Sequence, residues 1–210
     1  QCIWIVDERI DRILDCPPDA TAGRVIDANE SWVIPGLWDM HVHALWDSVV
    51  YRDFFADFIA HGVVGVRDMG GDPDVLLEAR SYLAHEENPG PELIAAGYVL
   101  DGPSPIHPDI AAGVYSAEDG ANAVAALDSI GSDFIKIYTL LPKAAATGVF
   151  DEARRRGLKV VGHLPVELEL ADAINSGMAG IEHMAVEIGG LCDVDDAAAC
   201  RRIFKTIRDA

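Results

Sequence analysis

The fold is decided by residues 33–43, which read VIPGLWDMHVH. In an extended strand every second side chain points to the same face, so His41 and His43 can reach one metal ion from a rigid support. An H-x-H pair is weak evidence by itself, because exposed strands also carry such pairs by chance. The positions of the other histidines decide between a metal site and chance.

Two further histidines close short apolar runs. His163 ends the run KVVGH at residues 159–163, and His183 ends the run AGIEH at residues 179–183. In a β/α barrel the carboxyl ends of the strands form the rim of the active site, so ligands far apart in sequence converge there. Three independent positions at strand ends therefore favour a metal site.

Lys136 lies in a further apolar run, DFIKIY, at residues 133–138. Strand alternation turns Lys136 and Tyr138 to one side and Ile135 and Ile137 to the other. A buried ammonium group is costly, so Lys136 requires an ion pair with a nearby acid, a chemical modification or association with a metal. The pattern favours the last two explanations and leaves the first open.

From residue 32 onward, short apolar runs alternate with segments of helical periodicity. Strands are expected at residues 32–43, 63–68, 92–100, 134–138, 159–163 and 180–183, and helices at residues 49–60, 74–85, 117–130, 143–156, 167–176 and 195–208. Such repeats build either a doubly wound sheet or a closed barrel of eight units. A complete barrel takes about 250 residues, so only six units are expected here.

The first segment of the chain has a different pattern. Short β-type runs at residues 3–6 and 24–26 are separated by Pro17 and Pro18, which predicts part of a small sheet. We therefore expect two domains, residues 1–31 and residues 32–210. Because the sequence opens with Gln1 rather than Met, we also expect a piece of a longer chain.

The charge of the chain excludes two classes of partner. Its 35 acidic and 16 basic residues give a net charge of -19, which repels nucleic acid and anionic membrane surfaces. No apolar run approaches the roughly 18 residues that span a bilayer, so we expect a soluble protein, either cytoplasmic or exported to the periplasm. Cys192 and Cys200 can form a disulfide in an exported protein, whereas buried free thiols are the alternative.

Taken together, these motifs resemble the amidohydrolase superfamily, specifically its prolidase-like branch, which is related to imidazolonepropionase. The matching segments are PGL at residues 35–37 with Asp39, His41 and His43, GVRDMGG at residues 65–71, Lys136 with Tyr138, GHLP at residues 162–165, and EH at residues 182–183. The resemblance implies an α/β fold, a (β/α)8 barrel truncated at both ends, with residues 1–31 contributing part of a β-sandwich.

The resemblance also implies a binuclear metal centre. His41 and His43 would bind one divalent metal and His163 and His183 the other, with zinc as the default metal. Lys136, carboxylated by carbon dioxide or bicarbonate, would bridge them and lose its positive charge. The metals would activate a hydrolytic water and polarise the substrate carbonyl.

Catalytic roles are implied for Lys136 and Tyr138, the latter as a donor to the oxyanion. His107 lies in a Pro-rich rim loop, where a substrate contact and a solvated histidine are equally expected. Arg67 and Asp68 are interpreted as an ion pair behind the site or as a substrate clamp, with the first favoured. Glu182 is expected to point to the strand face opposite the site.

One family residue has no counterpart here. The family places an aspartate at the end of the eighth strand, where it transfers the proton from the nucleophilic water to the leaving group. Asp193, Asp195 and Asp196 follow the sixth strand and do not match this aspartate.

The expected function is hydrolysis of peptide-like or N-acyl amino acid bonds, including Xaa-Pro dipeptides, in small-molecule substrates. Formation of a homo-oligomer is left open. The alternatives are a lactonase or phosphotriesterase, a non-catalytic metal-binding barrel, and an isomerase or decarboxylase.

Overall fold

The computed structural model describes residues 1–16, 23–28, 31–49, 51–183 and 197–209. The chain divides into two compact units, Gln1–Pro35 and Gly36–Ala210. The boundary expected from the sequence, between residues 31 and 32, lies a few residues earlier.

The first unit contains an antiparallel hairpin of β1 (Cys2–Val6) and β2 (Arg9–Leu14). Asp7 and Glu8 form its two-residue turn, and both have positive φ angles, as the tight turn of a hairpin requires. Residues 24–26, expected to be a strand, are not in a strand, because they pair with no other strand among the described residues. The β-sandwich is therefore still a prediction.

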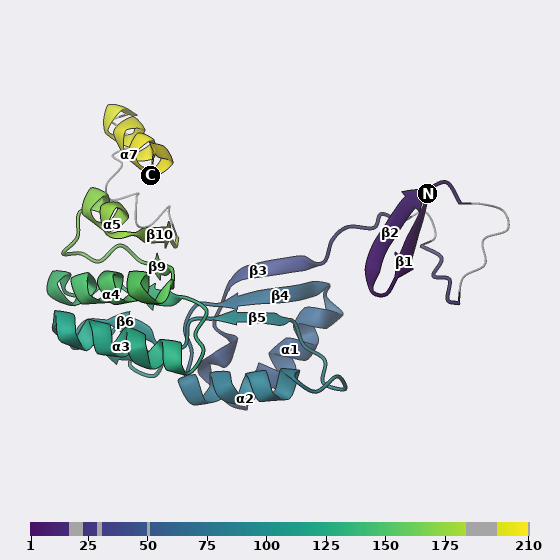
Figure 1. Cartoon of the computed structure of the whole chain (residues 1–210), viewed down its shortest axis with the longest axis horizontal. Helices are drawn as coiled ribbons and strands as arrows, with labels where there is room; N and C mark the ends of the chain where they lie inside the picture. Colours follow the sequence, from purple (N-terminus) through teal and green to yellow (C-terminus); the bar gives the residue numbers. More distant parts are fainter. Residues whose placement is uncertain (17–22, 29–30, 50, 184–196, 210) are drawn as a thin grey trace. The chain divides into compact units, whose positions relative to one another are not determined.

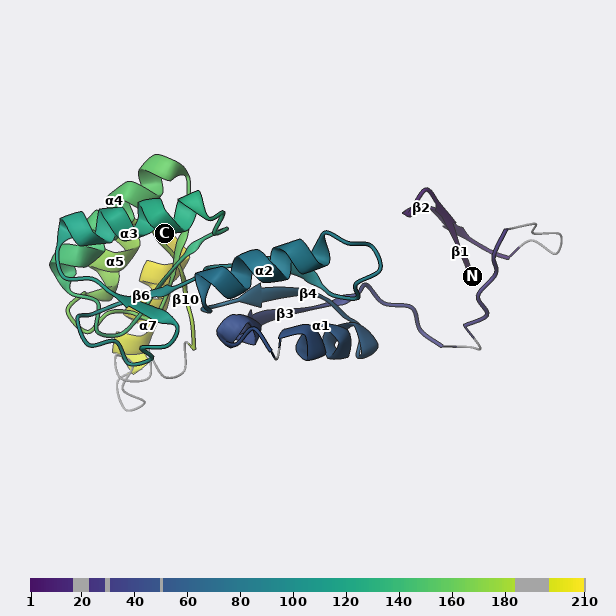
Figure 2. The same cartoon turned by 90° about the horizontal axis from the view of Figure 1, so that it is seen from below.

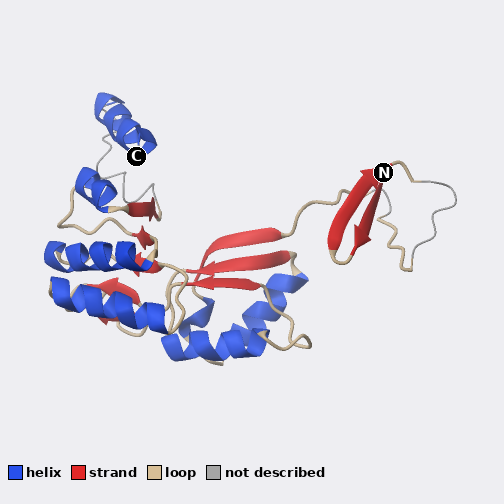
Figure 3. Ribbon diagram, in the orientation of Figure 1, coloured by secondary structure: helices blue, strands red, loops and turns tan. Residues whose placement is uncertain are grey.

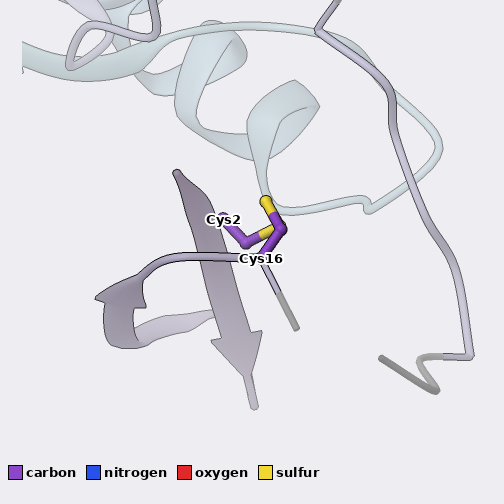
Figure 4. Close-up of a disulfide and its surroundings, with 2 residues drawn as sticks. All are labelled: Cys2 and Cys16. Atoms are coloured by element: carbon purple, nitrogen blue, oxygen red, sulfur yellow. A yellow bond between two sulfur atoms is a disulfide. The ribbon is translucent and has the colours of Figure 1, made fainter. Parts of the chain in front are cut away.

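A disulfide between Cys2 and Cys16 closes the ends of this hairpin, with the two Cα atoms 5.0 Å apart (Figure 4). This pair was not expected from the sequence, because neither cysteine belongs to a short-spaced motif. The pair that was expected includes Cys192, which lies outside the described residues, so a Cys192–Cys200 disulfide is still a prediction.

The second unit is a mixed α/β structure in which every strand pairing among the described residues is parallel. One sheet has the order β3-β4-β5 and the other the order β10-β9-β8-β6-β7. The strands are β3 (Leu37–Val42), β4 (Val63–Asp68), β5 (Glu92–Ala95), β6 (Val99–Asp101), β7 (Ala111–Gly113), β8 (Ile135–Ile137), β9 (Val160–Gly162) and β10 (Met178–Ile181). This confirms the α/β class with parallel strands, while a closed barrel is still a prediction.

Helices follow the strands along the chain (Figures 1 and 3). They are the short 3-10 helix η1 (Ala44–Trp46), α1 (Tyr51–Ala60), α2 (Pro73–Leu83), α3 (Ala117–Ser129), α4 (Lys143–Arg156), α5 (Leu170–Ser176) and α7 (Ala197–Asp209). Five of the six expected helices overlap these closely. The sixth, at residues 195–208, begins in residues that are not described and otherwise corresponds to α7. None of the described helices is long and apolar enough to cross a bilayer.

Two apolar clusters attach these helices to the sheets. Leu76 of α2 and Phe55 of α1 pack with Ala95 of β5, and Val149 of α4 packs with Ile135 and Ile137 of β8. Figures 1 and 2 both show α3 and α4 side by side in this second cluster. Burial of such side chains contributes about 1.5–3 kcal/mol each, which holds the strand ends in place.

The single strand expected at residues 92–100 is wrong. The structure has two strands, β5 and β6, separated by a bend at Gly97, whose φ is +73°. Gly97 O accepts the N–H of Gly71, and Ala96 N–H donates to Asp68 O, so the backbone leaves the ladder of β5 here. As a result β5 pairs with β4, whereas β6 pairs with β7 and β8.

Candidate functional site

Four of the predicted metal ligands lie together at the carboxyl ends of three strands. His41 is on β3 and His43 follows it, whereas His163 and His183 follow β9 and β10. The ring centroids of His41 and His43 are 5.4 Å apart, those of His163 and His183 are 5.2 Å apart, and those of His41 and His183 are 4.4 Å apart. The structure therefore brings both predicted pairs to one place.

Hydrogen bonds fix the orientation of three of these rings. His41 Nδ1 lies 2.9 Å from Glu182 Oε2, and His43 Nδ1 lies 2.8 Å from the backbone oxygen of Gly70. His163 Nδ1 is 3.1 Å from the hydroxyl of Thr139. Because Nδ1 is the bonded atom in each case, the opposite nitrogen, Nε2, points away from the supporting group.

The expected orientation of Glu182 is wrong. Strand β10 ends at Ile181, and His183 has a φ of +53°, so regular alternation has ceased where Glu182 and His183 occur. Both side chains consequently reach His41, Glu182 through a hydrogen bond and His183 through a ring contact. A local bend of two residues was not visible in the sequence pattern.

Arg67 ties Glu182 to β3. Its Nη2 donates to Glu182 Oε1 at 2.6 Å, and its Nε donates to the backbone oxygen of Met40 at 2.8 Å. The guanidinium also lies 5.7 Å from the ring centroid of Phe134. Arg67 therefore forms an ion pair behind the histidines with Glu182 rather than with its neighbour Asp68, and its role as a substrate clamp is still a prediction.

Asp68 and Asp101 are fully buried carboxylates at the ends of β4 and β6. Asp68 accepts the backbone N–H groups of Leu45 and Gly70 at 3.0 and 3.1 Å, but burial outweighs these bonds and raises the pKa of Asp68 to about 7. Asp101 accepts two backbone N–H groups in the same way. Each aspartate therefore holds two rim segments together, a role that was not predicted from the sequence.

Lys136 is buried on β8, with 1% of its surface exposed. Its Nζ lies 5.8 Å from the ring centroid of Tyr138, while Ile135 and Ile137 point into the cluster beneath the helices. The predicted alternation of this strand is therefore confirmed. The lysine is on the same side of the strand as the tyrosine.

Three of the four histidines, His41, His43 and His163, are held neutral by their surroundings. Burial, followed by the charge of Lys136, lowers the pKa of His163 to about 4. Burial is also the largest cause that lowers the pKa of His41 and of His43. At neutral pH these rings therefore carry a lone pair, which is the form that can bind a metal.

Seven aromatic rings form a closed circuit of contacts. Starting from His43, the centroid distances are 6.3 Å to Trp46, 5.9 Å from there to His107, 5.6 Å to Tyr138 and 4.1 Å to His163. The contacts through His183 and His41 complete the circuit. The structure thus places His107 and Tyr138 beside the histidines and adds Trp46, which the sequence analysis did not single out.

Among the described residues, no three side chains of His, Cys, Asp or Glu already surround a common point as metal ligands do. The arrangement is two pairs of histidines with a lysine nearby. The predicted bridge is Lys136, which would become a ligand only after carboxylation. This finding therefore does not test the bridge.

The fold is shared with solved structures of known proteins. A bottromycin amidohydrolase is 26% identical with a TM-score of 0.62, covering 81% of this chain and 38% of that chain. A prolidase complexed with N-methylphosphonate-L-proline is 23% identical with a TM-score of 0.75, covering 97% and 59%. A Xaa-Pro dipeptidase with bound methionine in its active site is 19% identical with a TM-score of 0.60, covering 80% and 51%.

No protein-family model and no curated protein matches the chain. The chain spans between about two fifths and three fifths of the length of the structures just named. The resemblance predicted from the motifs is confirmed at the level of fold: the structural neighbours of this chain are amidohydrolases and prolidase-like proteins.

Proposed function

We propose that this chain is the metal-binding part of a hydrolase that cleaves amide bonds in small peptide-like substrates. The observation that carries the proposal is the meeting of His41, His43, His163 and His183 from three strand ends beside the buried Lys136. Amidohydrolase and prolidase neighbours support hydrolysis of an amide bond.

The histidine pairs fit a divalent metal such as zinc. With a Zn–N distance of about 2.0–2.1 Å, two imidazoles on one tetrahedral zinc have ring centroids about 5 Å apart. The two predicted pairs lie at 5.4 and 5.2 Å. In addition, Glu182 and Gly70 O support Nδ1 of His41 and His43, the support that metal-binding histidines usually have.

Lys136 fits the role of a bridge once it is carboxylated. The ammonium would first lose a proton, and the neutral amine would then form an N–C bond to carbon dioxide and release a second proton. The product is a carbamate, whose two oxygen atoms and negative charge suit the neighbourhood of divalent cations. The reaction also removes an ammonium charge from a side chain that is 1% exposed. Bound metals would polarise the scissile carbonyl and acidify a water molecule.

The other residues of the site have supporting roles in this proposal. Tyr138 would donate its hydroxyl hydrogen to the oxygen of the developing tetrahedral centre. His107, in ring contact with Tyr138, and Trp46, in ring contact with His107, would contact the substrate. Two donors of Arg67 are already bonded to Met40 and Glu182, so we assign it to the support of the histidines rather than to substrate binding.

The substrate class follows from the neighbours and is part of the proposal. One neighbour is a prolidase and another a Xaa-Pro dipeptidase, so we propose Xaa-Pro dipeptides and N-acyl amino acids as substrates of the protein to which this chain belongs. Aromatic rings beside the histidines offer an apolar contact to a proline ring or a side chain of such a substrate.

Elemental analysis tests the metal centre. The chain is prepared with zinc and bicarbonate, and close to two metals per chain are expected, with a clear loss in Lys136→Met. Lys143→Met is the matched control, because Lys143 is an exposed lysine paired with Asp172. A wild-type chain without metal, or equal loss in both variants, would contradict the proposal.

A substrate panel then tests the reaction. Dipeptides and N-acyl amino acids are compared with lactones and aryl phosphates at equal concentration, with and without zinc. Hydrolysis of the amides that requires zinc is expected. Preference for lactones or phosphates would indicate the alternative ester hydrolase, and a chain that binds zinc but hydrolyses nothing would indicate a metal-binding barrel without activity.

A further inference from the structure

Two neighbouring residues at the end of β4 each lead to one histidine of the H-x-H pair. The first connection runs from Arg67, whose Nη2 donates to Glu182 Oε1 at 2.6 Å. The other oxygen of the same carboxylate, Oε2, lies 2.9 Å from His41 Nδ1. Glu182 is thus held on one side by a guanidinium and holds an imidazole on the other.

The second connection runs from the adjacent residue, Asp68. Its Oδ1 accepts the N–H of Gly70 at 3.1 Å, and the oxygen of Gly70 lies 2.8 Å from His43 Nδ1. Gly70 has a φ of +153°, and an added Cβ would lie 2.4 Å from Val99 Cγ2. The residue that carries the carbonyl is therefore fixed by Asp68 on one side and is restricted to glycine.

These contacts determine which nitrogen of each ring carries the hydrogen. A backbone carbonyl only accepts, so Nδ1 of His43 must be the donor. Glu182 Oε1 accepts Nη2 of Arg67 at 2.6 Å, and this ion pair with a permanently charged guanidinium is the contact of an ionised carboxylate. An ionised carboxylate also only accepts, so Nδ1 of His41 is the donor as well.

We propose that Arg67 and Asp68 are positioning residues that set the tautomer of His41 and His43, so that Nε2 is the lone-pair atom on both rings. The tautomers themselves do not depend on the proposed function. Only their purpose rests on it, because a metal ion would bind to the lone pairs on Nε2. If the two residues did not set the tautomers, the motif RDMGG at residues 67–71 would only stabilise the rim through an ion pair and a turn.

The tautomers are measured by nitrogen-15 NMR of histidine-labelled, metal-free protein at pH 7.5. His41→Gln and His43→Gln variants assign the two ring signals. In the wild type, both rings are expected to have hydrogen on Nδ1. Finding either ring with hydrogen on Nε2 would overturn the proposal.

Substitutions at Glu182 test the first connection. Glu182→Leu removes the acceptor at similar size, and His41 is expected to shift to a mixture of tautomers while His43 is unchanged. Glu182→Gln keeps an acceptor oxygen and is expected to restore the wild-type signal of His41. An unchanged His41 in Glu182→Leu, or equal changes at both histidines, would overturn the proposal.

Arg67→Met tests the same connection from its far end and does not depend on whether Glu182→Leu folds. The Glu182 carboxylate then lacks its guanidinium partner, so a partial shift of the His41 signal is expected. Arg80→Met is the matched control, because Arg80 forms an ion pair with Asp133 at 2.8 Å that involves no histidine. Equal His41 signals in both variants would remove Arg67 from the proposal.

Asp68→Asn tests the second connection, with Asp101→Asn as its control. Both aspartates are fully buried and accept two backbone N–H groups, but only Asp68 leads to His43. The His43 signal is expected to change in Asp68→Asn and to stay in Asp101→Asn. The same change in both variants would mean general loosening of the rim and would contradict positioning.

Zinc titration separates this inference from the proposed function. Loss of a partner behind a metal ligand weakens binding by about 10-fold to 100-fold, so Glu182→Leu is expected to bind zinc about 10-fold more weakly. If the tautomers are as expected but the wild type binds no zinc, the proposed function fails and the positioning stands. If the wild type binds zinc and Glu182→Leu alters neither tautomer nor affinity, the positioning fails alone.

Discussion

Asp101 Oδ1 accepts the backbone N–H of Leu140 at 2.8 Å and so joins the end of β6 to the segment that follows Tyr138. The second oxygen, Oδ2, accepts the N–H of Ile106 at 3.0 Å, next to His107. One buried carboxylate thereby positions two segments of the rim.

Replacing this carboxylate should destabilise the fold. In Asp101→Asn one N–H group faces the amide NH2 instead of an acceptor, which costs about 1–3 kcal/mol for a buried group. Urea denaturation of the metal-free chain measures the change. Asp109→Asn, at an exposed position of the same loop, should leave the midpoint unchanged, and a comparable loss in both variants would refute the assigned role.

Gly162→Ala should disrupt the position of His163. A Cβ on Gly162 would lie 2.0 Å from the backbone oxygen of Ile137, and the φ of +142° is unfavourable for alanine. The clash would be between the backbones of β9 and β8, which cannot move aside as a flexible side chain can. We therefore expect loss of cooperative unfolding or of zinc binding. The matched control is Gly157→Ala, which has a φ of +75° with nothing within 4 Å and should cost only about 1 kcal/mol. Equal effects would disprove the steric argument.

Lys136→Met should raise the pKa of His163. Burial and the lysine charge lower that pKa to about 4, and removal of a nearby positive charge makes protonation easier. The pKa should stay below 6.5, because burial, the larger cause, persists. NMR titration of the metal-free protein measures the shift, and an unchanged value would show that the charge is already absent, as carboxylation would make it.

His163 should also make the stability depend on pH. Its pKa is lower in the folded state than in the unfolded state, so the unfolded chain binds the proton more readily below pH 6.5. Stability from this residue is therefore present above pH 6.5 and is lost as the pH falls toward 4. Asp68 acts with the opposite sign: its pKa is raised from 3.8 to about 7, so its stabilising contribution is full below pH 3.8 and is lost as the pH rises from 3.8 to 7. Comparison of wild type with His163→Asn by urea denaturation at pH 7.5 and 5 isolates the histidine, and an identical pH dependence would contradict it.

Trp46→Ala should weaken substrate binding if the amide hydrolase is the correct function. Trp46 lies between His43 and His107 in the circuit of rings and is 42% exposed. Loss of an aromatic contact is worth about 0.5–1.5 kcal/mol, so KM should rise several-fold while kcat is nearly unchanged. Trp38→Ala, on β3 and 40% exposed, serves as the control.

The sequence predicted the strand ends of the site because a strand has a strict period of two. Lys136 and Tyr138 therefore fell on the correct side of β8, and the four histidines were expected at one rim. The same rule failed at Glu182, where the strand had already ended. Periodicity is informative only inside regular structure.

Other features depended on contacts that no local pattern contains. Strand β7 (Ala111–Gly113) has only three residues, and their side chains are small, so the sequence shows no apolar run there. The bend at Gly97 follows from hydrogen bonds to Gly71 and Asp68, which lie far back in the chain. Trp46 and Asp101 can be recognised as site residues only from the fold, which brings them into contact with residues distant in sequence.

The alignment of β4 with β5 is uninterrupted from Gly65 to Asp68. Arg67 and Asp68 leave this strand on opposite faces and lead to His41 and His43 respectively. A slip of one residue would exchange the two faces and detach both histidines together. The geometry of the H-x-H pair is therefore encoded in the register of the neighbouring strand, and an insertion within β4 would be more damaging there than the loss of either supporting side chain.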